Sequence, residues 1–390
     1  MNWFLTETQQ MIKETAREIA QKVIKPAAIE FDEKNEFPWD IQKVIADAGL
    51  FGVYVSEEYG GMLGPDDGMG IMNLVIATEE LSKACGGISL CLAATALGTI
   101  PIILMGSEEQ KKKYLPDLAS GKKIAAFGLT EAGAGSDAGS IQTTAKRDGD
   151  HYILNGTKQW ITNGEVAETY SIVAMTDKKK GARGASAFIV EKGTPGFSFG
   201  KKEDKMGIRA SSTYELVFED CRVPAANMLG KEGMGFLTAM RTFDMSRPGV
   251  AAQALGIAGG ALDDAVAYAR TREQFGKPIV SNQGLRFLLA DMSIRVETAR
   301  AMVYAVARSI DSGDHKCSKE SAIAKTYASD IAMQVTTDAV QVFGGYGYMK
   351  EYPMEKRMRD AKITQIYEGT NQIQRDVIGL QLVKEAASGE

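Results

Sequence analysis

The spacing of apolar residues changes twice along this chain of 390 residues, and the change limits the folds that it can adopt. Up to Gly121 the apolar residues recur at helical spacing, with breaks at glycine-rich turns. Between Lys122 and Val223, short runs of β-branched and aromatic residues alternate with turn signals, which is typical of antiparallel strands. From Gly233 long helical patterns with alanine-rich faces return. The order predicts an α+β protein with an N-terminal all-helical domain (1–120), a central antiparallel β-sandwich or barrel domain (121–232) and a C-terminal helical bundle domain (233–390).

The first predicted helix opens with a Thr-x-x-Gln capping box at Thr6 and Gln9, and Pro26 is expected to end it. This early helix leaves no room for a signal peptide or an Arg-rich transit sequence, and no window holds about 18 consecutive apolar residues. We therefore expect a cytoplasmic, bacterial protein without a membrane span.

Charge and cysteine usage exclude two classes of function. A net charge of −5 argues against a nucleic-acid-binding surface. Four cysteines without CxxC spacing and two histidines provide neither a disulfide framework nor a metal cluster, so we expect a reducing compartment and no metal site.

Near the C-terminus, Glu368 stands between Tyr367 and Gly369, just before a predicted helix. Apolar neighbours should desolvate the carboxyl and raise its pKa toward the range that suits abstraction of a weakly acidic C–H proton. Gly369 lets a ligand approach the backbone closely, and Thr370 and Asn371 are candidate helix caps. Taken alone, this pattern also fits an ordinary cap or a solvated charge.

A glycine-rich segment, residues 133–138, fits the loose G-x-G-x-x-A form of the dinucleotide fingerprint. That fingerprint requires a following helix, whereas the segment from Gln142 to Leu154 has the pattern of strands. We therefore predict a loop between strands whose amides and Ser136 hydroxyl meet phosphate or cofactor atoms, or a plain connecting loop.

Three segments together resemble the acyl-CoA dehydrogenase family of flavoproteins: residues 127–137, residues 159–163 and the Tyr-Glu-Gly-Thr segment at 367–370. The resemblance extends from Leu5 to Leu382, with the motifs in the family's order. It implies the same helix, strand, helix architecture and bound FAD.

The resemblance also implies FAD contacts in several parts of the chain. Trp160 would lie against the flavin ring, and Thr162 would donate a hydrogen bond to the flavin nitrogen that receives a hydride. Arg272, Phe275 and Gln283 would reach the cofactor of a neighbouring subunit, so the family is oligomeric and usually tetrameric. The implied FAD contacts are Phe127, Leu129, Thr130, Ser136, Trp160, Thr162, Arg272, Phe275, Gln283, Gln341, Gly345, Thr370 and Gln372.

Simpler interpretations exist for some of these residues when the resemblance is set aside. Trp160 would be a core or edge-strand tryptophan. The segment around Arg272 would be a helix C-terminus with basic charge and a glycine, and Gln341 would lie near a helix end at a double glycine.

The substrate contacts that the resemblance implies are Ser136, Asp244, Arg247, Tyr367 and Gly369. Asp244 and Arg247 would otherwise form a routine ion pair. Some members of the family carry their catalytic glutamate at the position that matches Ser246. Because this chain has serine there, Glu368 is the predicted base.

The implied reaction is α,β-dehydrogenation of an acyl-CoA thioester to the trans-2-enoyl-CoA, or the reverse reduction. Glu368 removes the α-proton, the β-hydride moves to flavin N5, and a backbone amide at the glutamate position helps to polarise the thioester carbonyl. In the family, electrons usually pass to electron-transferring flavoprotein.

The acyl group is less constrained by the sequence. Residues 206–210, 218–221 and 361–364 resemble short-chain, butyryl-CoA members, while residues 243–248 are closer to medium-chain members. The pocket segment 86–98 lacks Arg and Lys, which disfavours a dicarboxylic acyl group. Its small residues would also admit a branched, cyclic or aromatic acyl group.

Two further function classes stay open at this point. An acyl-CoA oxidase would share the fold and base but pass electrons to oxygen. A non-enzymatic, DNA-associated flavoprotein would want a basic surface tract, and the longest basic run, Lys178 to Lys180, fits a solvated hairpin tip better.

Overall fold

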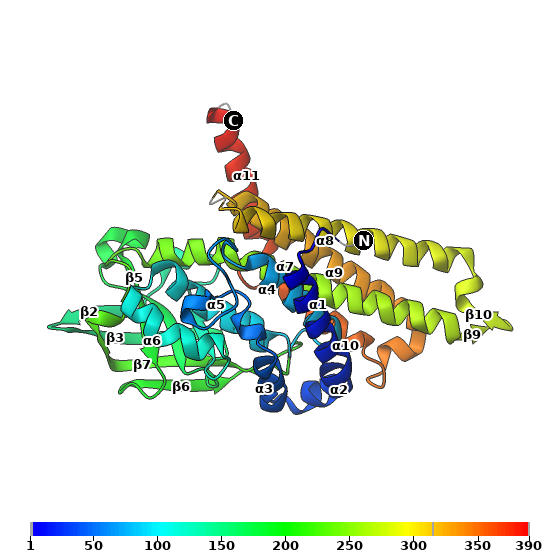
Figure 1. The fold of residues 1–390 in the computed structure, drawn as a ribbon, viewed down its shortest axis with the longest axis horizontal. Helices are drawn as coiled ribbons and strands as arrows, with labels where there is room; N and C mark the ends of the chain where they lie inside the picture. The colour runs from blue at the N-terminus through cyan, green and yellow to red at the C-terminus, as the bar shows by residue number, and fades with distance from the viewer. Residues whose placement is uncertain (1–2, 314–315, 389–390) are drawn as a thin grey trace.

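The computed structural model describes residues 3–313 and 316–388 (Figure 1). A helical N-terminal part leads into a mainly antiparallel sheet, and long helices follow. In Figure 1 the sheet lies at one end of the molecule and the long helices extend to the other. This order confirms the predicted α+β class and the predicted succession of helical, β and helical parts.

The N-terminal part contains six α-helices, α1 to α6. Thr6 Oγ1 accepts a hydrogen bond from the Gln9 amide (3.2 Å) and Gln9 Oε1 accepts one from the Thr6 amide (3.2 Å), which confirms the capping box. The helices are α1 (Glu7–Ile19), α2 (Lys25–Lys34), α3 (Trp39–Asp47), α4 (Ile71–Ala84), α5 (Leu90–Met105) and α6 (Glu108–Ala119), and short helical turns occupy Leu50–Gly52 and Glu57–Tyr59.

The expectation that Pro26 ends the first helix is wrong. A π-helical turn (Ala20–Ile24) joins α1 to α2, and Pro26 lies in the first turn of α2. Proline breaks a regular α-helix because it lacks an N–H and its ring clashes with the preceding turn, and here the preceding turn is the wider π-helical one. The helical path therefore continues to Lys34.

Eight strands form one hydrogen-bonded sheet in the order β6-β7-β3-β2-β4-β5-β8, and β1 pairs with β4 in parallel. A single residue pair, Thr144 with Met175, joins the β6-β7-β3-β2 half to the other half. Side chains from both halves pack into one apolar core, as in a sandwich. The strands are β1 (Ala125–Gly128), β2 (Thr144–Asp148), β3 (His151–Thr162), β4 (Thr169–Met175), β5 (Ala185–Glu191), β6 (Phe197–Lys202), β7 (Thr213–Pro224) and β8 (Met228–Leu229), with 3-10 turns at Ala138–Ser140, Lys178–Gly184 and Ala225–Asn227.

The C-terminal part is built around α7, which packs on α4, α5, α8 and α9. Glycines permit the closest of these approaches, because a Cβ at Gly256 would lie 2.3 Å from Glu79 O and one at Gly260 would lie 2.2 Å from Lys83 O. The elements are α7 (Gly235–Thr271), β9 (Glu273–Gln274), β10 (Lys277–Pro278), α8 (Gln283–Asp311), α9 (Ser318–Phe343), α10 (Met354–Thr364) and α11 (Asn371–Ser388), with 3-10 turns at Ile279–Ser281 and Gly344–Tyr348.

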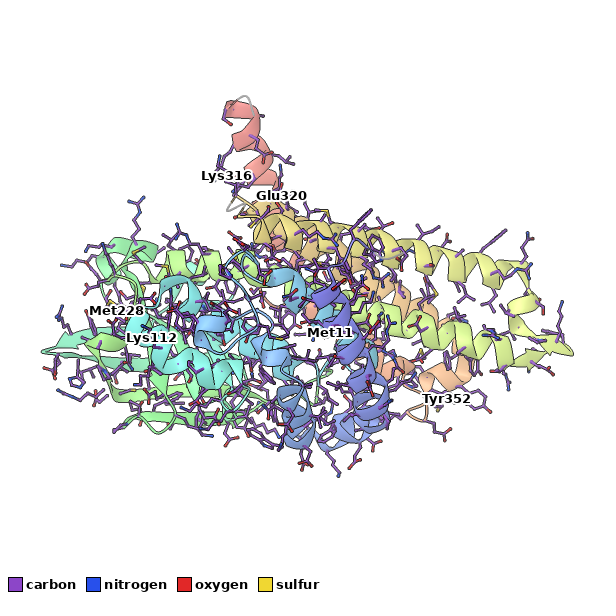
Figure 2. The ribbon with its side chains drawn as sticks, viewed as in Figure 1. Met11, Lys112, Met228, Lys316, Glu320 and Tyr352 are labelled. Atoms are coloured by element: carbon purple, nitrogen blue, oxygen red, sulfur yellow. The ribbon has the colours of Figure 1, made fainter. Side chains whose placement is uncertain are left out.

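The last helix, α11, rises away from the rest of the molecule (Figure 1). Figure 2 shows Glu320, near the start of α9, at the foot of α11. The neighbouring Lys319 forms an ion pair with Glu385 (2.6 Å), which lies near the C-terminal end of α11, and so links the projecting part of α11 to the start of α9. Within the described residues, no helix is both long enough and apolar enough to cross a membrane.

Candidate active site

A cavity of about 420 Å³ lies where the sheet meets the helices. Its walls come from α4, α5 and α7, from the loop after β1, from the end of β3, and from the turn between α10 and α11. The helical walls are mainly apolar, while the β wall and the turn carry hydroxyl and carboxyl groups. The two segments that sequence analysis singled out, around Ser136 and around Glu368, therefore face one space.

Glu368 lies in the turn between α10 and α11, with φ of 51° in the left-handed region. The residue is partly accessible through the cavity, but its carboxyl is enclosed by protein atoms. Ser246 Oγ donates a hydrogen bond to Glu368 Oε2 at 2.5 Å. Burial raises the pKa of the Glu368 carboxyl above its usual range, although the Ser246 hydrogen bond and the charges of Arg247 and Lys325 oppose the rise. The predicted desolvation of this carboxyl is confirmed.

The sequence correctly points to a cap at the start of α11. Thr370 Oγ1 accepts a hydrogen bond from the Ile373 amide (3.2 Å). Asn371 is buried instead, and its side chain bonds Lys325, Ser329 and Asp330 of α9. The turn is thus tied to α9 as well as to its own helix.

The β wall presents Trp160 in an unusual backbone conformation. Pairing between β3 and β7 shifts register between Lys158 and Ile161, and Trp160 within this bulge has φ of 57°. Bulges re-aim side chains, and here the indole is 55% exposed and lines the cavity beside Thr162. The simpler interpretation of Trp160 as a core or edge-strand tryptophan is therefore wrong, because the residue is exposed and β3 lies between β7 and β2.

A buried ion pair, which sequence analysis missed, holds the glycine-rich loop. Lys158 Nζ donates to Glu131 Oε1 (2.7 Å) and to the Leu129 carbonyl (2.9 Å). The Glu131 carboxylate also accepts hydrogen bonds from the backbone amides of Gln142 (2.6 Å) and Thr143 (2.9 Å). Burial lowers the pKa of Lys158 to about 8, although Glu131 opposes the shift. For Glu131, burial favours a raised pKa, but Lys158 and these amides outweigh it and the pKa is lowered.

The loop lies between strands, as predicted, since a single 3-10 turn separates it from β2. Ser136 is exposed and lines the cavity together with Phe127, Leu129 and Thr130. A planar ring system would fit beside the half-exposed indole of Trp160, and the hydroxyl-bearing residues of this wall offer hydrogen bonds to its edge. The residues of this wall therefore fit a flavin.

Asp244 and Arg247, on α7, form the ion pair that their spacing suggested, with 3.0 Å between Asp244 Oδ1 and an Arg247 nitrogen. Ser318 Oγ also donates to Asp244 Oδ2 (2.5 Å). Arg247 is buried and lines the cavity, and among the described residues its Nε has no hydrogen-bond partner. Burial raises the pKa of Asp244 and lowers that of Arg247.

A second set of predicted cofactor residues lies away from this cavity. Arg272 and Gly345 line a separate hollow beside Tyr268 and Tyr346. Phe275 is 98% exposed, between β9 and β10 at the far end of the long helices (Figure 1). The others, Gln283, Gln341 and Gln372, are exposed and do not line the main cavity. One copy of the chain does not bring the two sets together.

Family models match the chain in three consecutive parts. They are described as the N-terminal, middle and C-terminal domains of acyl-CoA dehydrogenase and match residues 6–122, 126–221 and 233–383. The short-chain-specific acyl-CoA dehydrogenase of Clostridium acetobutylicum is 52% identical over 379 residues, which cover 97% of this chain and 98% of that protein.

Two solved structures are similar over nearly the whole chain. The butyryl-CoA dehydrogenase from Megasphaera elsdenii matches with a TM-score of 0.95 and 50% identity, covering 98% of this chain and 100% of that one. A chain in a structure on the electron-transferring flavoprotein of Acidaminococcus fermentans and flavin-based electron bifurcation matches with a TM-score of 0.94 and 53% identity, covering 98% and 99%.

Proposed function

Because this chain belongs to the acyl-CoA dehydrogenase family and is therefore an oxidoreductase, we propose that it dehydrogenates a short- or medium-chain acyl-CoA thioester, or catalyses the reverse reduction. The observation that carries the proposal is the enclosed Glu368 carboxyl, which faces the same cavity as Trp160 and Thr162. A base on one wall and a flavin-compatible surface on the other suit removal of a proton and a hydride from adjacent carbons.

FAD is the cofactor that we propose, and when bound it would supply the hydride acceptor. On the β wall it would be held by the predicted residues that line the cavity, namely Phe127, Leu129, Thr130, Ser136, Trp160 and Thr162. Thr370, which lies in the turn before α11 and does not line the cavity, is a further proposed contact. The distant set, Arg272, Phe275, Gln283, Gln341, Gly345 and Gln372, would hold the FAD of a neighbouring copy.

Glu368 is the proposed base for the α-proton. Its raised pKa brings the carboxylate closer in basicity to a weak carbon acid. A bound acyl chain against the apolar residues of α5 would displace water from the carboxyl. Among the described residues, no acceptor meets the backbone amide of Glu368, so that amide is available to the thioester carbonyl. A carbonyl held there would place its α-carbon next to the base.

The acyl end of the cavity supports a short, uncharged chain. Leu90, Ala93, Ala94 and Leu97 of α5 line it. Arg247 is the cation among the residues that line the cavity, and it is paired with Asp244. A second carboxylate on the acyl group would therefore lack a partner, and the similarity to butyryl-CoA and short-chain enzymes favours a butyryl-sized group.

We propose electron-transferring flavoprotein as the electron partner and a homo-oligomer, a tetramer, as the working form in a bacterial cytoplasm. The split of the cofactor residues into two sets supports an oligomer. The projecting α11 supports it too, because Leu380, Leu382 and Val383 are more than half exposed on it and would be covered by another copy.

Anaerobic titration of the FAD-loaded protein tests the function. Butyryl-CoA should bleach the flavin absorbance, hexanoyl- and octanoyl-CoA should do so less efficiently, and glutaryl-CoA should fail. Reoxidation should be slow in air and fast with electron-transferring flavoprotein. Bleaching by none of the acyl-CoAs would refute the dehydrogenase proposal, and peroxide formed at the turnover rate would assign the protein to the oxidases instead.

A further inference from the structure

Lys325 lies against the turn that carries Glu368, although it does not line the cavity. It belongs to α9, and its side chain is fully buried. Its Nζ donates to the carbonyl oxygen of Gly369 (2.8 Å) and to Asn371 Oδ1 (2.9 Å). The ammonium group therefore contacts the residue that follows the proposed base and the first residue of α11.

The turn needs such support because its backbone is strained. Glu368 and Gly369 have φ values of 51° and 92°, and a non-glycine residue keeps a left-handed conformation only where its surroundings hold it. Gln374 Nε2 donates to the carbonyl oxygens of Glu368 (2.9 Å) and Gly369 (3.2 Å). Lys325 and Gln374 thus converge on the Gly369 carbonyl from two different helices.

A neutral side chain could make the same hydrogen bonds, so the buried charge of Lys325 requires its own explanation. Three charged groups act electrostatically on the pKa of this ammonium: Glu368 and Asp330 raise it, and Arg247 lowers it. Arg247 is a like charge and is paired with Asp244 (3.0 Å). The Asp330 carboxylate already accepts hydrogen bonds from other side chains, namely Arg375 (2.6 Å), Gln365 (2.6 Å) and Asn371 (2.8 Å). Within the part of the chain that the structure describes, Glu368 is the acidic group of the three that has no cation bonded to it.

We propose that Lys325 is a positioning residue for the reaction: it fixes the turn through Gly369, and its charge keeps the Glu368 carboxylate ionised at the edge of the cavity. This inference rests on the proposed role of Glu368 as the base. Burial lowers the pKa of Lys325 to about 7, against the opposing effect of Glu368. The charge is therefore present on the acid side of neutrality, where a buried base is most at risk of protonation.

The test compares four variants with the wild type. The first two, Lys325→Met and Lys325→Gln, remove the charge, and the glutamine keeps a donor for Gly369. Lys325→Arg keeps the charge. The matched control is Ser329→Ala, which removes the hydroxyl that accepts from Asn371 Nδ2 (2.9 Å) and so loosens the same scaffold without a charge change. Flavin reduction by butyryl-CoA is followed by anaerobic rapid mixing from about pH 5.5 to about pH 9, beside the thermal unfolding midpoint of each FAD-loaded protein.

The two neutral variants should lose about threefold in reduction rate below neutral pH, with the acidic limb of the profile moved to higher pH, and should approach the wild type above about pH 7.5. Lys325→Arg and Ser329→Ala should leave the limb in place, even where the unfolding midpoint falls. If Lys325→Met does not fold, Lys325→Gln carries the comparison.

If butyryl-CoA reduces the flavin of the wild type but the acidic limb of the pH profile stays at its wild-type position in the neutral variants, this inference is overturned and the proposed function is not. A limb that moves equally in Ser329→Ala would do the same, because loosening without a charge change would then explain the effect. A wild type that no acyl-CoA reduces would refute the proposed function and this inference with it.

Discussion

The two walls of the cavity are each held by a fully buried lysine, but the two lysines have different partners. On the β wall, Lys158 bonds the Leu129 carbonyl and the carboxylate of Glu131. On the opposite wall, Lys325 bonds the Gly369 carbonyl and the neutral amide of Asn371. Each lysine therefore holds a backbone carbonyl next to the site, while only Lys158 has its charge neutralised in direct contact.

We infer from this difference that Lys158 stabilises the loop on the β wall, whereas Lys325 affects the protonation of Glu368. The charge of Lys158 is matched by Glu131, which also holds the two amides that begin the return to β2, so the pair closes a loop. The charge of Lys325 acts beyond its own hydrogen bonds, toward Glu368. We therefore expect mutations on the β wall to change stability and cofactor content, and mutations on the other wall to change rate and pH dependence.

The largest effect should come from Glu368→Gln. The substitution keeps the size of the side chain and a hydrogen-bonding group for Ser246, but removes the proton acceptor. Flavin reduction by butyryl-CoA should fall by at least about 10²–10⁴-fold, the usual contribution of a positioned base, while FAD content and acyl-CoA binding persist. Rapid-mixing spectroscopy measures the rate, and equilibrium titration measures the binding.

The double variant Ser246→Glu, Glu368→Gln tests whether a carboxylate on α7 can replace Glu368 as the base. Ser246 Oγ lies 2.5 Å from Glu368 Oε2, so a carboxylate introduced on α7 would reach nearly the same point of the cavity. Partial recovery of the reduction rate should follow. If the flavin of Glu368→Gln is reduced as fast as that of the wild type, another group takes the proton. The expectation that mutations on this wall change the rate would then be wrong.

The sequence was sufficient for the order of domains and for the desolvation of the Glu368 carboxyl, but not for the distant groups that act on it. Helical and strand spacing are local properties, so the order of domains could be predicted without knowing the tertiary contacts. The apolar run around Glu368 is local too, but Ile366 in it is 47% exposed, and the carboxyl meets Ser246 of α7. Pro26 was misjudged because its effect depends on whether it falls inside a helix or in its first turn, and the π-helical turn before it moved that boundary.

The two lysines were missed because their partners are distant in sequence. Lys158 meets Glu131 across 27 positions and Lys325 meets Gly369 across 44, and an isolated lysine has no local signature of burial. One signal was present in the sequence for Lys325: it occupies a helical position in register with Ala322, Ser329 and Ala332, which form a small, buried face. A lysine on such a face is uncommon and marks a paired or functional group.

An intermediate effect, on stability rather than rate, should come from Lys158→Met. Glu131 would be left as a buried carboxylate without its cation, and breaking a buried pair in this way typically destabilises a protein by about 3–5 kcal/mol. The free energy of unfolding in urea and the FAD content of the purified protein should both fall. Lys22→Met, in an exposed pair with Glu18, is the control and should leave stability nearly unchanged.

Adding Glu131→Gln to Lys158→Met sharpens the comparison. The double variant removes the uncompensated charge, so part of the lost stability should return. A Lys158→Met protein that keeps its FAD and its stability, but shows a displaced pH profile, would mean that Lys158 also tunes the site. Mutations on both walls would then affect the pH dependence of the rate, and the walls would differ only in the size of that effect.

A smaller effect should come from Ser246→Ala. Burial raises the pKa of Glu368, and the Ser246 hydroxyl opposes this by donating to the ionised carboxylate. The base must be ionised to accept a proton, so the rate rises with pH through the pKa of Glu368. Removing the hydroxyl raises that pKa further, which takes activity away on the acid side and leaves the rate at high pH nearly unchanged.

A single hydrogen bond contributes about 1 kcal/mol, so the reduction rate of Ser246→Ala below neutral pH should fall about fivefold. Ser246→Thr keeps the hydroxyl and should follow the wild-type profile. A rate that is lowered equally at every pH would show that Ser246 acts on the geometry of the turn and not on the protonation of the base.

Ser246 and Lys325 belong to different helices, α7 and α9. If each acts on Glu368 through charge stabilisation alone, the double variant should displace the acidic limb of the pH profile by nearly the sum of the two single displacements. A combined displacement well below that sum would indicate that the serine and the lysine hold one shared conformation of the turn.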